Sequence, residues 1–477
     1  MRECTKARDP SGLPTWRSAE QMSSLEPQNP LEALRNGPGS GPIRLLAAAA
    51  ADSDGLEMPA AVLIGEEGVI AVGSPAGVGP VEGPDLDLGD VLLTPALVNA
   101  HVHLDLTDVG PIPLDGGFDR WLAEVRERRP HDEAAVAAAV ANGVEASLAG
   151  GVVAVGDIAG AMGWTAARSL AASDLAGISF VEVFGIGGRE AAGLDAVADL
   201  EARIAGLGSI RPDFRIGLSP HAPYSCGRAV YEAAARSGLA VATHLCESPE
   251  EVEFVRRGQG PFVDMLRAIG ALGPDGDVLE AIGVPASGLH PIELLEDTTP
   301  SRPWVLAHLN YPAEPEEDSA TLAARLDILR CLDATVVYCP RAYRFLGHPR
   351  PGRDPHPWRR LAEAGVNVAL GTDGVPCLDS AARLSTFDEI RLLLAEGGSL
   401  PDGLAMATTH GARALGLDPT AVTFHGGATA GLLATPVAGA RGMTTPMELA
   451  AGIAKGDGGP EWILPPRPSR MQPAADG

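Results

Sequence analysis

Short apolar runs of strand length recur through the middle of the chain, and Ala-rich segments of helical length separate them. Helical candidates include EAAVAAAVANGVEASLAG and EEVEFVRRGQGPFVDMLRAIG. Eight strands alternating with helices favour the α/β class, and they predict a (β/α)8 TIM barrel over residues 93–419. The eight strand candidates are VLLTPALVNAHVHL from Val91, GVVAVGDIAG from Gly151, GISFVEVFGIGG from Gly177, RIGLSPHAPYS from Arg215, LAVATHLCES from Leu239, WVLAHLNY from Trp304, ATVVYCP from Ala334 and VNVALGTDG from Val366.

Shorter apolar runs flank this repeat on both sides. Between residues 43 and 92 they are broken by Gly and acidic turns, which indicates antiparallel strands, and a strand-like GLLATPVAG begins at Gly431. We therefore expect a small β-sandwich domain built from residues 43–92 and 420–439. Residues 1–42 and 461–477 are rich in Pro, Gly, Ser and charge without periodicity, so both ends are expected to be disordered.

Histidines and a carboxylate stand at the ends of the predicted strands, where a TIM barrel places its active site. The ends of strands one, four, five, six, seven and eight read HVH, PHAPY, THLCE, HLN, YCPR and TDG. His101 and His103 are two residues apart on one strand, so both point to the same face. Alone they could be two structural histidines. Together with His244 and Asp373 they form a three-His, one-carboxylate set that suits zinc or ferrous iron.

A bound ion of this kind lowers the pKa of its water to around 7, so a metal-bound hydroxide is the expected nucleophile. Glu247, three residues after His244, is the candidate proton shuttle, although an acid there also suits the first turn of a helix. His308 is expected to orient the hydroxide, and Asp373 to accept its proton while remaining a ligand. The only two lysines of the chain lie outside the predicted strands, so we expect one ion rather than a lysine-bridged pair.

The composition narrows the range of partners and compartments. A formal net charge of −26 argues against nucleic acid as a partner, because phosphate contacts need clustered Lys and Arg. Six cysteines without paired spacing indicate a reducing compartment. The sequence shows neither the apolar core of a secretory signal at its start nor a run of 18 strongly apolar residues, so no membrane partner is expected. We expect a cytoplasmic protein that acts on a small molecule.

A set of ordered motifs then carries a family resemblance from residue 43 to residue 439. The motifs are LLTPALVNAHVHLDL, GLSPHAPYS, THLCESPEEVEFV, AHLNY, YCPRAYRFLGH, LGTDG and MATTHGARALGL. The chain resembles the amidohydrolase superfamily in its branch of mononuclear deaminases and chlorohydrolases. It is most similar to the aminodeoxyfutalosine deaminases, which share the ESPEEVEF-like run and the Gly260-Pro261-Phe262 segment.

The resemblance implies hydrolytic loss of ammonia from the purine ring of an adenine nucleoside, with aminodeoxyfutalosine of menaquinone biosynthesis as the leading substrate. It implies one divalent ion, zinc before iron, on His101, His103, His244 and Asp373. Glu247 and His308 would then serve the proton transfers. Substrate contacts would come from His221, Glu247, Arg341 and His348. A structural role for His221 is equally compatible with the sequence, and so is a salt-bridge role in the segment that holds Arg341 and His348.

Several alternatives remain open from the sequence. The same site suits S-adenosylhomocysteine, methylthioadenosine or guanine as a substrate, or a triazine-type chlorohydrolase, and a non-catalytic binding relative is a further reading. The chain departs from the family where Gly374 follows the last aspartate instead of the usual Ser, and where the closing segment is reduced to TAGLLA. Barrel enzymes of this kind often pair, so a homodimer is also an expectation.

Overall fold

The structure is a computed structural model that describes residues 41–80, 82, 85–160, 162–208, 210–284, 288–298, 300–379 and 383–474. The expected disorder of residues 1–42 therefore falls outside the described part of the chain, apart from Gly41 and Pro42.

Eight parallel strands form the barrel, and each of the eight predicted runs overlaps one of them. Hydrogen bonds join every strand to its neighbour in chain order. The predicted (β/α)8 fold is therefore confirmed. The strands are β6 (Leu97–Val102), β7 (Val152–Ala159), β8 (Ala176–Val183), β9 (Phe214–Pro220), β10 (Val241–Leu245), β11 (Trp304–His308), β12 (Thr335–Tyr338) and β13 (Asn367–Leu370).

The first and last barrel strands meet just beyond the end of β13. The carbonyl of His101 accepts hydrogen bonds from the backbone amides of Thr372 and Asp373, each at 3.0 Å. The Asn99 side chain donates to the hydroxyl of Thr372 at 2.8 Å and accepts from its amide at 3.0 Å. This seam brings Asp373 beside His101 of β6 and beside His103, which follows the end of β6.

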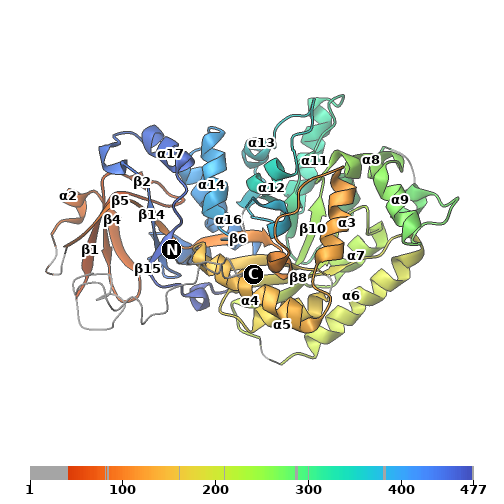
Figure 1. The fold of residues 1–477 in the computed structure, drawn as a ribbon, viewed down its shortest axis with the longest axis horizontal. Helices are drawn as coiled ribbons and strands as arrows, with labels where there is room; N and C mark the ends of the chain where they lie inside the picture. The colour runs from red at the N-terminus through yellow and green to blue at the C-terminus, as the bar shows by residue number, and fades with distance from the viewer. Residues whose placement is uncertain are drawn as a thin grey trace, which may run out of the picture. The chain divides into compact units, whose positions relative to one another are not determined.

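Helices lie outside the barrel strands, as Figure 1 shows for α4 to α7. The predicted helix after the first strand is α4. The segment after the fifth strand was predicted as one helix but forms two, α8 and α9, because Gly258 ends α8 in the left-handed conformation and Pro261 begins α9.

The helices are α2 (Pro75–Val78), α3 (Phe118–Arg128), α4 (Glu133–Ala149), α5 (Gly163–Ala171), α6 (Glu190–Ala205), α7 (Arg228–Arg236), α8 (Pro249–Arg257), α9 (Pro261–Ala268), α10 (Val278–Ile282), α11 (Ser319–Cys331), α12 (Pro340–Phe345), α13 (Trp358–Glu363), α14 (Thr386–Ala395), α15 (Leu400–Ala407), α16 (Thr409–Ala414) and α17 (Pro446–Lys455).

A second sheet joins segments from both ends of the described chain. Its strand order is β15-β14-β5-β1-β3-β4, and β2 pairs with β1. The predicted return strand is β14, which pairs antiparallel with β5. The strands are β1 (Ile43–Ala51), β2 (Leu56–Glu57), β3 (Ala60–Ile64), β4 (Val69–Gly73), β5 (Asp85–Pro95), β14 (Leu432–Pro436) and β15 (Glu461–Leu464).

Two boundaries differ from those expected. The run from Val91 is shared between the sheets, because β5 continues to Pro95 and only Ala96 separates it from β6. The disorder expected from residue 461 onward is wrong for the described residues, since β15 pairs with β14 there. Apolar burial explains this strand: Ile463 is buried, and Trp462 donates its indole N–H to the carbonyl of Leu148 at 2.8 Å.

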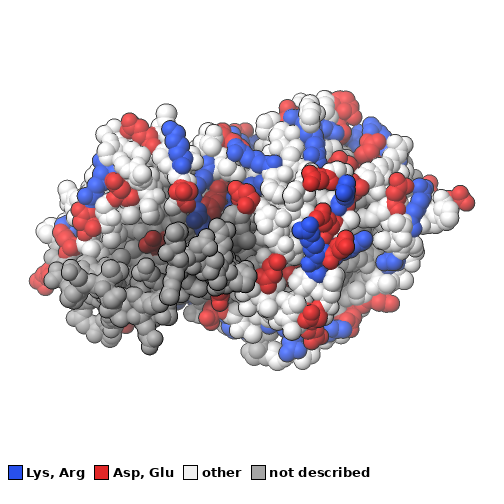
Figure 2. Space-filling model, viewed as in Figure 1, with Lys and Arg blue, Asp and Glu red and all other residues white. Residues whose placement is uncertain are grey.

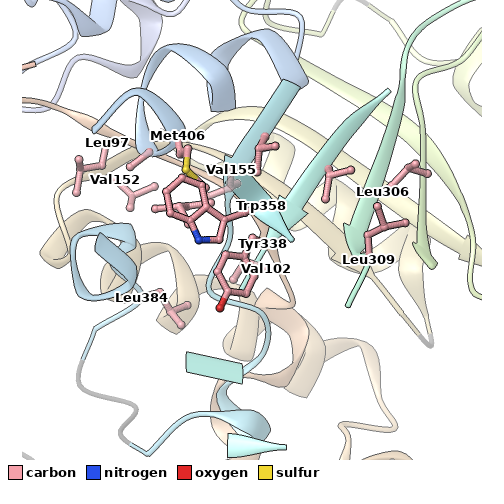
Figure 3. Close-up of a cluster of buried hydrophobic side chains, with 14 of the residues drawn as sticks. Leu97, Val102, Val152, Val155, Leu306, Leu309, Tyr338, Trp358, Leu384 and Met406 are labelled. Atoms are coloured by element: carbon pink, nitrogen blue, oxygen red, sulfur yellow. The ribbon is translucent and has the colours of Figure 1, made fainter. Parts of the chain in front are cut away.

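The core fills the space between the barrel strands and the surrounding helices. Figure 3 shows the rings of Tyr338 and Trp358 among aliphatic side chains that include Val155 of β7 and Leu306 of β11. All four side chains are buried. This packing holds the strand ends, and therefore the polar groups on them, in fixed positions.

On the face drawn in Figure 2, basic and acidic side chains of the described residues are interspersed. Within the described residues, every helix is too short or too polar to cross a membrane.

Candidate active site

Three histidines and one carboxylate meet at the carboxyl ends of the barrel strands. The Nε2 atoms of His103 and His244 are 3.2 Å apart. Asp373 Oδ1 lies 3.5 Å from His103 Nε2 and 3.8 Å from His101 Nε2. The ligand atoms of His101, His103 and His244 lie within 4.8 Å of one another, and so do those of His101, His308 and Asp373. These distances suit donors that face one common point.

Burial keeps these histidines neutral. It lowers the pKa of His101, His103 and His308 well below the ordinary value, and neighbouring histidines lower it further. It lowers the pKa of His244 to about 4. A neutral imidazole has the free lone pair that a metal ion requires.

Hydrogen bonds leave the appropriate nitrogens free for an ion. His244 Nδ1 is 3.0 Å from the carbonyl of His221, so this nitrogen carries the proton and Nε2 carries the lone pair. The Nε2 atoms of His101 and His308 are buried without a hydrogen-bond partner among the described residues. Buried polar atoms are normally paired, so these nitrogens call for a partner. Histidine nitrogens and a carboxylate oxygen are ligand atoms that a divalent ion such as zinc accepts, so these side chains fit such an ion.

Two residues of the site have strained backbone conformations. His308 and Asp373 have φ angles of 71° and 60°, in the left-handed region that non-glycine residues rarely occupy. Each such residue costs about 1–3 kcal/mol and persists only where its surroundings hold it in place, and such residues cluster at functional sites. For Asp373 the seam supplies this support, and its Oδ1 also accepts from the amide of Gly374 at 2.6 Å.

Glu247 lies beside these donors in the loop between β10 and α8. Its Oε1 is 3.6 Å from His308 Nε2, and its side chain is buried. Burial raises the pKa of Glu247 well above its ordinary value, and the charges of Asp373 and Glu251 raise it further. Its backbone is fixed by Glu251, which accepts from its amide, and by Asn310, which donates to its carbonyl at 2.9 Å. A protonated carboxyl group held in this way can donate a proton to a substrate.

A cavity of about 200 Å³ opens beside the donors. One wall is apolar and comes from α3 and α9, with Phe118, Trp121 and Met265 among its residues. Phe184, directly after β8, is 47% exposed and also lines the cavity. Such a combination of an apolar wall and a few polar groups is typical of small-molecule sites.

Arg129, Glu182 and His221 form the polar side of this cavity. The Nε2 of His221 is 3.7 Å from Glu182 Oε1, and Arg129 pairs with Glu182 at 3.9 Å and with Asp105 at 3.2 Å. Arg129 also lies against Gly160, where an added Cβ would be only 1.8 Å from its Nη2. The guanidinium therefore depends on the absence of a side chain at Gly160.

The structure separates the residues expected to contact the substrate. His221 and Glu247 line the cavity, whereas Arg341 and His348 are not among its lining residues. Arg341 is paired with the buried carboxylate of Glu389, and His348 Nδ1 is 2.6 Å from the hydroxyl of Tyr311. Arg341 therefore takes the salt-bridge role that the sequence also allowed, and neither Arg341 nor His348 lines the cavity where a substrate would bind.

Sequence reasoning missed several residues that build the site. Arg129 and Glu182 stand in Arg- and apolar-rich stretches without a motif, so nothing in the sequence distinguishes them. Glu251 lies inside the predicted ESPEE helix start, and its spacing of four from Glu247 could have identified it as a supporting residue. His356 donates to the carbonyl of His308 at 2.8 Å from a Pro-rich loop that predicts no element.

An eight-stranded parallel barrel with histidine and carboxylate donors at its carboxyl ends defines the class of barrel hydrolases that use a metal ion. Comparison with known families agrees with this class, since the profile of the Amidohydrolase family matches residues 92–457. The chain belongs to the amidohydrolase family.

Curated relatives include several nucleoside deaminases. The chain is 33% identical over 296 residues to the aminodeoxyfutalosine deaminase of Deinococcus radiodurans, which covers 60% of this chain and 64% of that protein. It is 27% identical over 343 residues to the 5′-deoxyadenosine deaminase of Methanothermobacter thermautotrophicus. This match covers 69% of this chain and 70% of that protein. The chain thus spans a little under two thirds of the first of these relatives.

Solved structures share the fold. The aminofutalosine deaminase of Helicobacter pylori, in complex with methylthio-coformycin, superposes with a TM-score of 0.66 at 20% identity and covers 90% of this chain and all of that one. The atrazine chlorohydrolase of Arthrobacter aurescens, complexed with zinc, superposes with a TM-score of 0.61 at 18% identity. The match covers 87% of this chain and 91% of that one. At these identities the likeness concerns the fold alone.

Proposed function

We propose that the protein is a metal-dependent aminohydrolase that removes ammonia from the purine ring of an adenine nucleoside. The observation that carries this proposal is the convergence of His101, His103, His244 and Asp373 on one point, with the buried Glu247 carboxyl group beside it and a cavity in front. Deaminases of adenine nucleosides among the curated relatives support the reaction.

One divalent ion, with zinc as the first candidate, would be held by His101, His103, His244 and Asp373. When bound, it would supply a water of lowered pKa for attack on the ring carbon that carries the amine. The zinc-containing neighbours of this fold support zinc.

The chain's own residues would handle the protons. Glu247, whose pKa is raised by burial, would donate its proton to the ring nitrogen beside the attacked carbon, take up the proton of the hydroxyl group that forms on that carbon, and deliver this proton to the departing amine. His308, 3.6 Å from Glu247 and 3.9 Å from Asp373 Oδ2, would orient the attacking water. Asp373 would accept a proton from this water and return it to Glu247 at the end of the reaction. His221, which lines the cavity, would contact the substrate.

Aminodeoxyfutalosine is the first substrate to test. The relative from Deinococcus radiodurans supports it, and the apolar wall from α3 and α9 suits a nucleoside with a large apolar substituent. 5′-Deoxyadenosine, methylthioadenosine and S-adenosylhomocysteine follow, because relatives are named for them.

The experiment is an ammonia-release assay on metal-loaded full-length protein with these nucleosides, adenosine, guanine and a chlorotriazine. Glu247→Gln should lose most of the rate while it still binds the ion. Glu253→Gln, an α8 glutamate that pairs with Arg257 on the surface, is the matched control and should keep the wild-type rate. Release of chloride from the triazine without ammonia from any nucleoside would replace the deaminase proposal with a chlorohydrolase.

A further inference from the structure

Three buried side chains between β12 and β13 each carry a polar atom without a hydrogen-bond partner among the described residues. The atoms are Tyr343 Oη, His348 Nε2 and His356 Nδ1. The centroid of the Tyr343 ring lies 5.4 Å from that of His348 and 6.0 Å from that of His356. An unpaired buried polar atom costs about 1–3 kcal/mol, so these three neighbouring side chains call for a hydrogen-bond partner.

The proton on His348 can be placed from its neighbours. The hydroxyl oxygen of Tyr311 accepts a hydrogen bond from the amide of Arg350 at 3.1 Å. Its own proton is therefore free to be donated to His348 Nδ1, 2.6 Å away. His348 Nδ1 is then the acceptor, and in the neutral ring the proton resides on Nε2. The unpaired atom of His348 is a donor.

The same reasoning gives the opposite result for His356. Its Nε2 lies 2.8 Å from the carbonyl of His308, which can only accept, so Nε2 carries the proton. The Nδ1 atom of His356 is then an acceptor. The His356 ring is further held by stacking on Tyr338, with centroids 3.8 Å apart and planes 10° from parallel. The cluster thus offers one donor, one acceptor and one hydroxyl group that can be either.

We propose that Tyr343, His348 and His356 bind one internal water molecule, and that His356, fixed by this water, is a positioning residue for His308. A water molecule can accept from His348, donate to His356 and bond to the Tyr343 hydroxyl at once. Internal waters typically make about three such hydrogen bonds. The role of the cluster in the reaction rests on the proposed function, whereas the water site itself does not.

His308 needs this support because its backbone is strained. His308 and Leu309 have φ angles of 71° and 52°, so two consecutive non-glycine residues are left-handed. Two hydrogen bonds from the following backbone hold the turn to the end of β10, from Leu309 N to the Leu245 carbonyl and from Asn310 N to the Cys246 carbonyl. The hydrogen bond from His356 Nε2 holds the carbonyl of His308 itself.

A high-resolution crystal structure of the metal-loaded full chain tests the water site. We expect one water within about 3.2 Å of Tyr343 Oη, His348 Nε2 and His356 Nδ1. Rings turned to bond with one another, or a site without solvent density, would overturn this part of the proposal.

Kinetics of two His356 variants test the positioning role. His356→Ala removes the bond to His308 and should lower kcat about 10–100-fold, with KM within about threefold and an unchanged metal content. His356→Gln, which keeps an N–H donor, should recover much of that loss. His410→Ala is the matched control, since His410 also bonds a strand carbonyl, that of Val368 at 2.9 Å, and lies outside the site.

Failure of the positioning role and failure of the proposed function give different results. If His356→Ala has a wild-type kcat per folded molecule, His356 has only a structural role and the inference fails. If wild-type protein releases ammonia from no nucleoside, the proposed function fails instead. In that case the crystal structure of His356→Ala decides the positioning role, because the φ angle of His308 should move out of the left-handed region.

Discussion

The buried carboxylate of Glu251 accepts a hydrogen bond from the backbone amide of Glu247 at 3.1 Å and a second from the amide of Cys246 at 2.7 Å. Glu251 lies in the first turn of α8, so the start of this helix is tied to the loop that carries the proposed proton donor. Cys246 has a φ angle of 53°, which makes this loop a second strained segment beside the site.

Replacing Glu251 should therefore displace Glu247. Glu251→Gln puts an NH2 group where an acceptor is needed, so one backbone amide loses its partner. We expect a loss of about 1–3 kcal/mol in the free energy of unfolding and a fall in kcat that exceeds any change in KM. Denaturant unfolding and steady-state ammonia release measure the two effects. Glu253→Gln on the same helix serves as the control.

Removal of the ion should weaken the folded state as well as the activity. Ligand binding to the native state adds RT ln(1 + [L]/Kd), which is about 4 kcal/mol at a thousandfold excess over Kd. Chelated protein should thus melt at a lower temperature than zinc-loaded protein. His101→Asn should bind much less than one ion per chain and show little of this shift. The surface variant His131→Asn should behave as wild type; equal metal content in both variants would refute the ligand set.

A single methyl group at position 160 should disturb the substrate side of the cavity. Its Cβ would overlap Arg129 Nη2, so Gly160→Ala should drive the guanidinium away from Glu182 and His221. A loss of about 1–2 kcal/mol in substrate binding corresponds to a 5–30-fold rise in KM. The double variant with Arg129→Ala should be no worse than Arg129→Ala alone. Additive effects would show that Gly160 acts through something other than Arg129.

The buried pair of Glu389 and Arg341 should make stability depend on pH. Burial raises the pKa of Glu389 to about 7, despite the opposing effect of Arg341. A carboxyl group whose pKa is raised in the folded state contributes stability below its unfolded pKa of about 4.3, and this contribution is lost as pH rises through about 7. The destabilisation caused by Glu389→Gln, measured by unfolding in urea, should therefore be larger at pH 5 than at pH 8.5. Glu396→Gln, from the exposed pair with Arg344, should show no such trend.

Much of the barrel was predictable because each strand carries its own signal. All eight strand runs and the long helix α4 read directly as apolar periodicity. The residues proposed as ligands were also visible, since they follow strand ends where a barrel must place its chemistry. The strand β15 was missed because four residues followed by Pro465 and Pro466 resemble a tail until a partner strand is known.

The supporting residues of the site could not be predicted, because their roles depend on long-range packing. Arg129 matters through its fit against Gly160, and His356 through a bond to a backbone carbonyl, and neither relation leaves a pattern in the sequence. For the same reason Arg341 was a substrate candidate: the sequence shows an arginine in a family motif, but not the buried Glu389 that engages it.

The seam between β6 and β13 also has a consequence for biosynthesis. Asn99 and Thr372, which bond across it, are 273 residues apart in the chain. At 5–20 residues per second, Thr372 leaves the ribosome roughly 14–55 s after Asn99. His101 and His103 are therefore made well before Asp373 and lack its carboxylate until nearly the whole barrel has been synthesised. A nascent chain that stalls before that point would hold an incomplete set of the proposed ligands, so secure capture of the proposed ion would be a late event in biosynthesis.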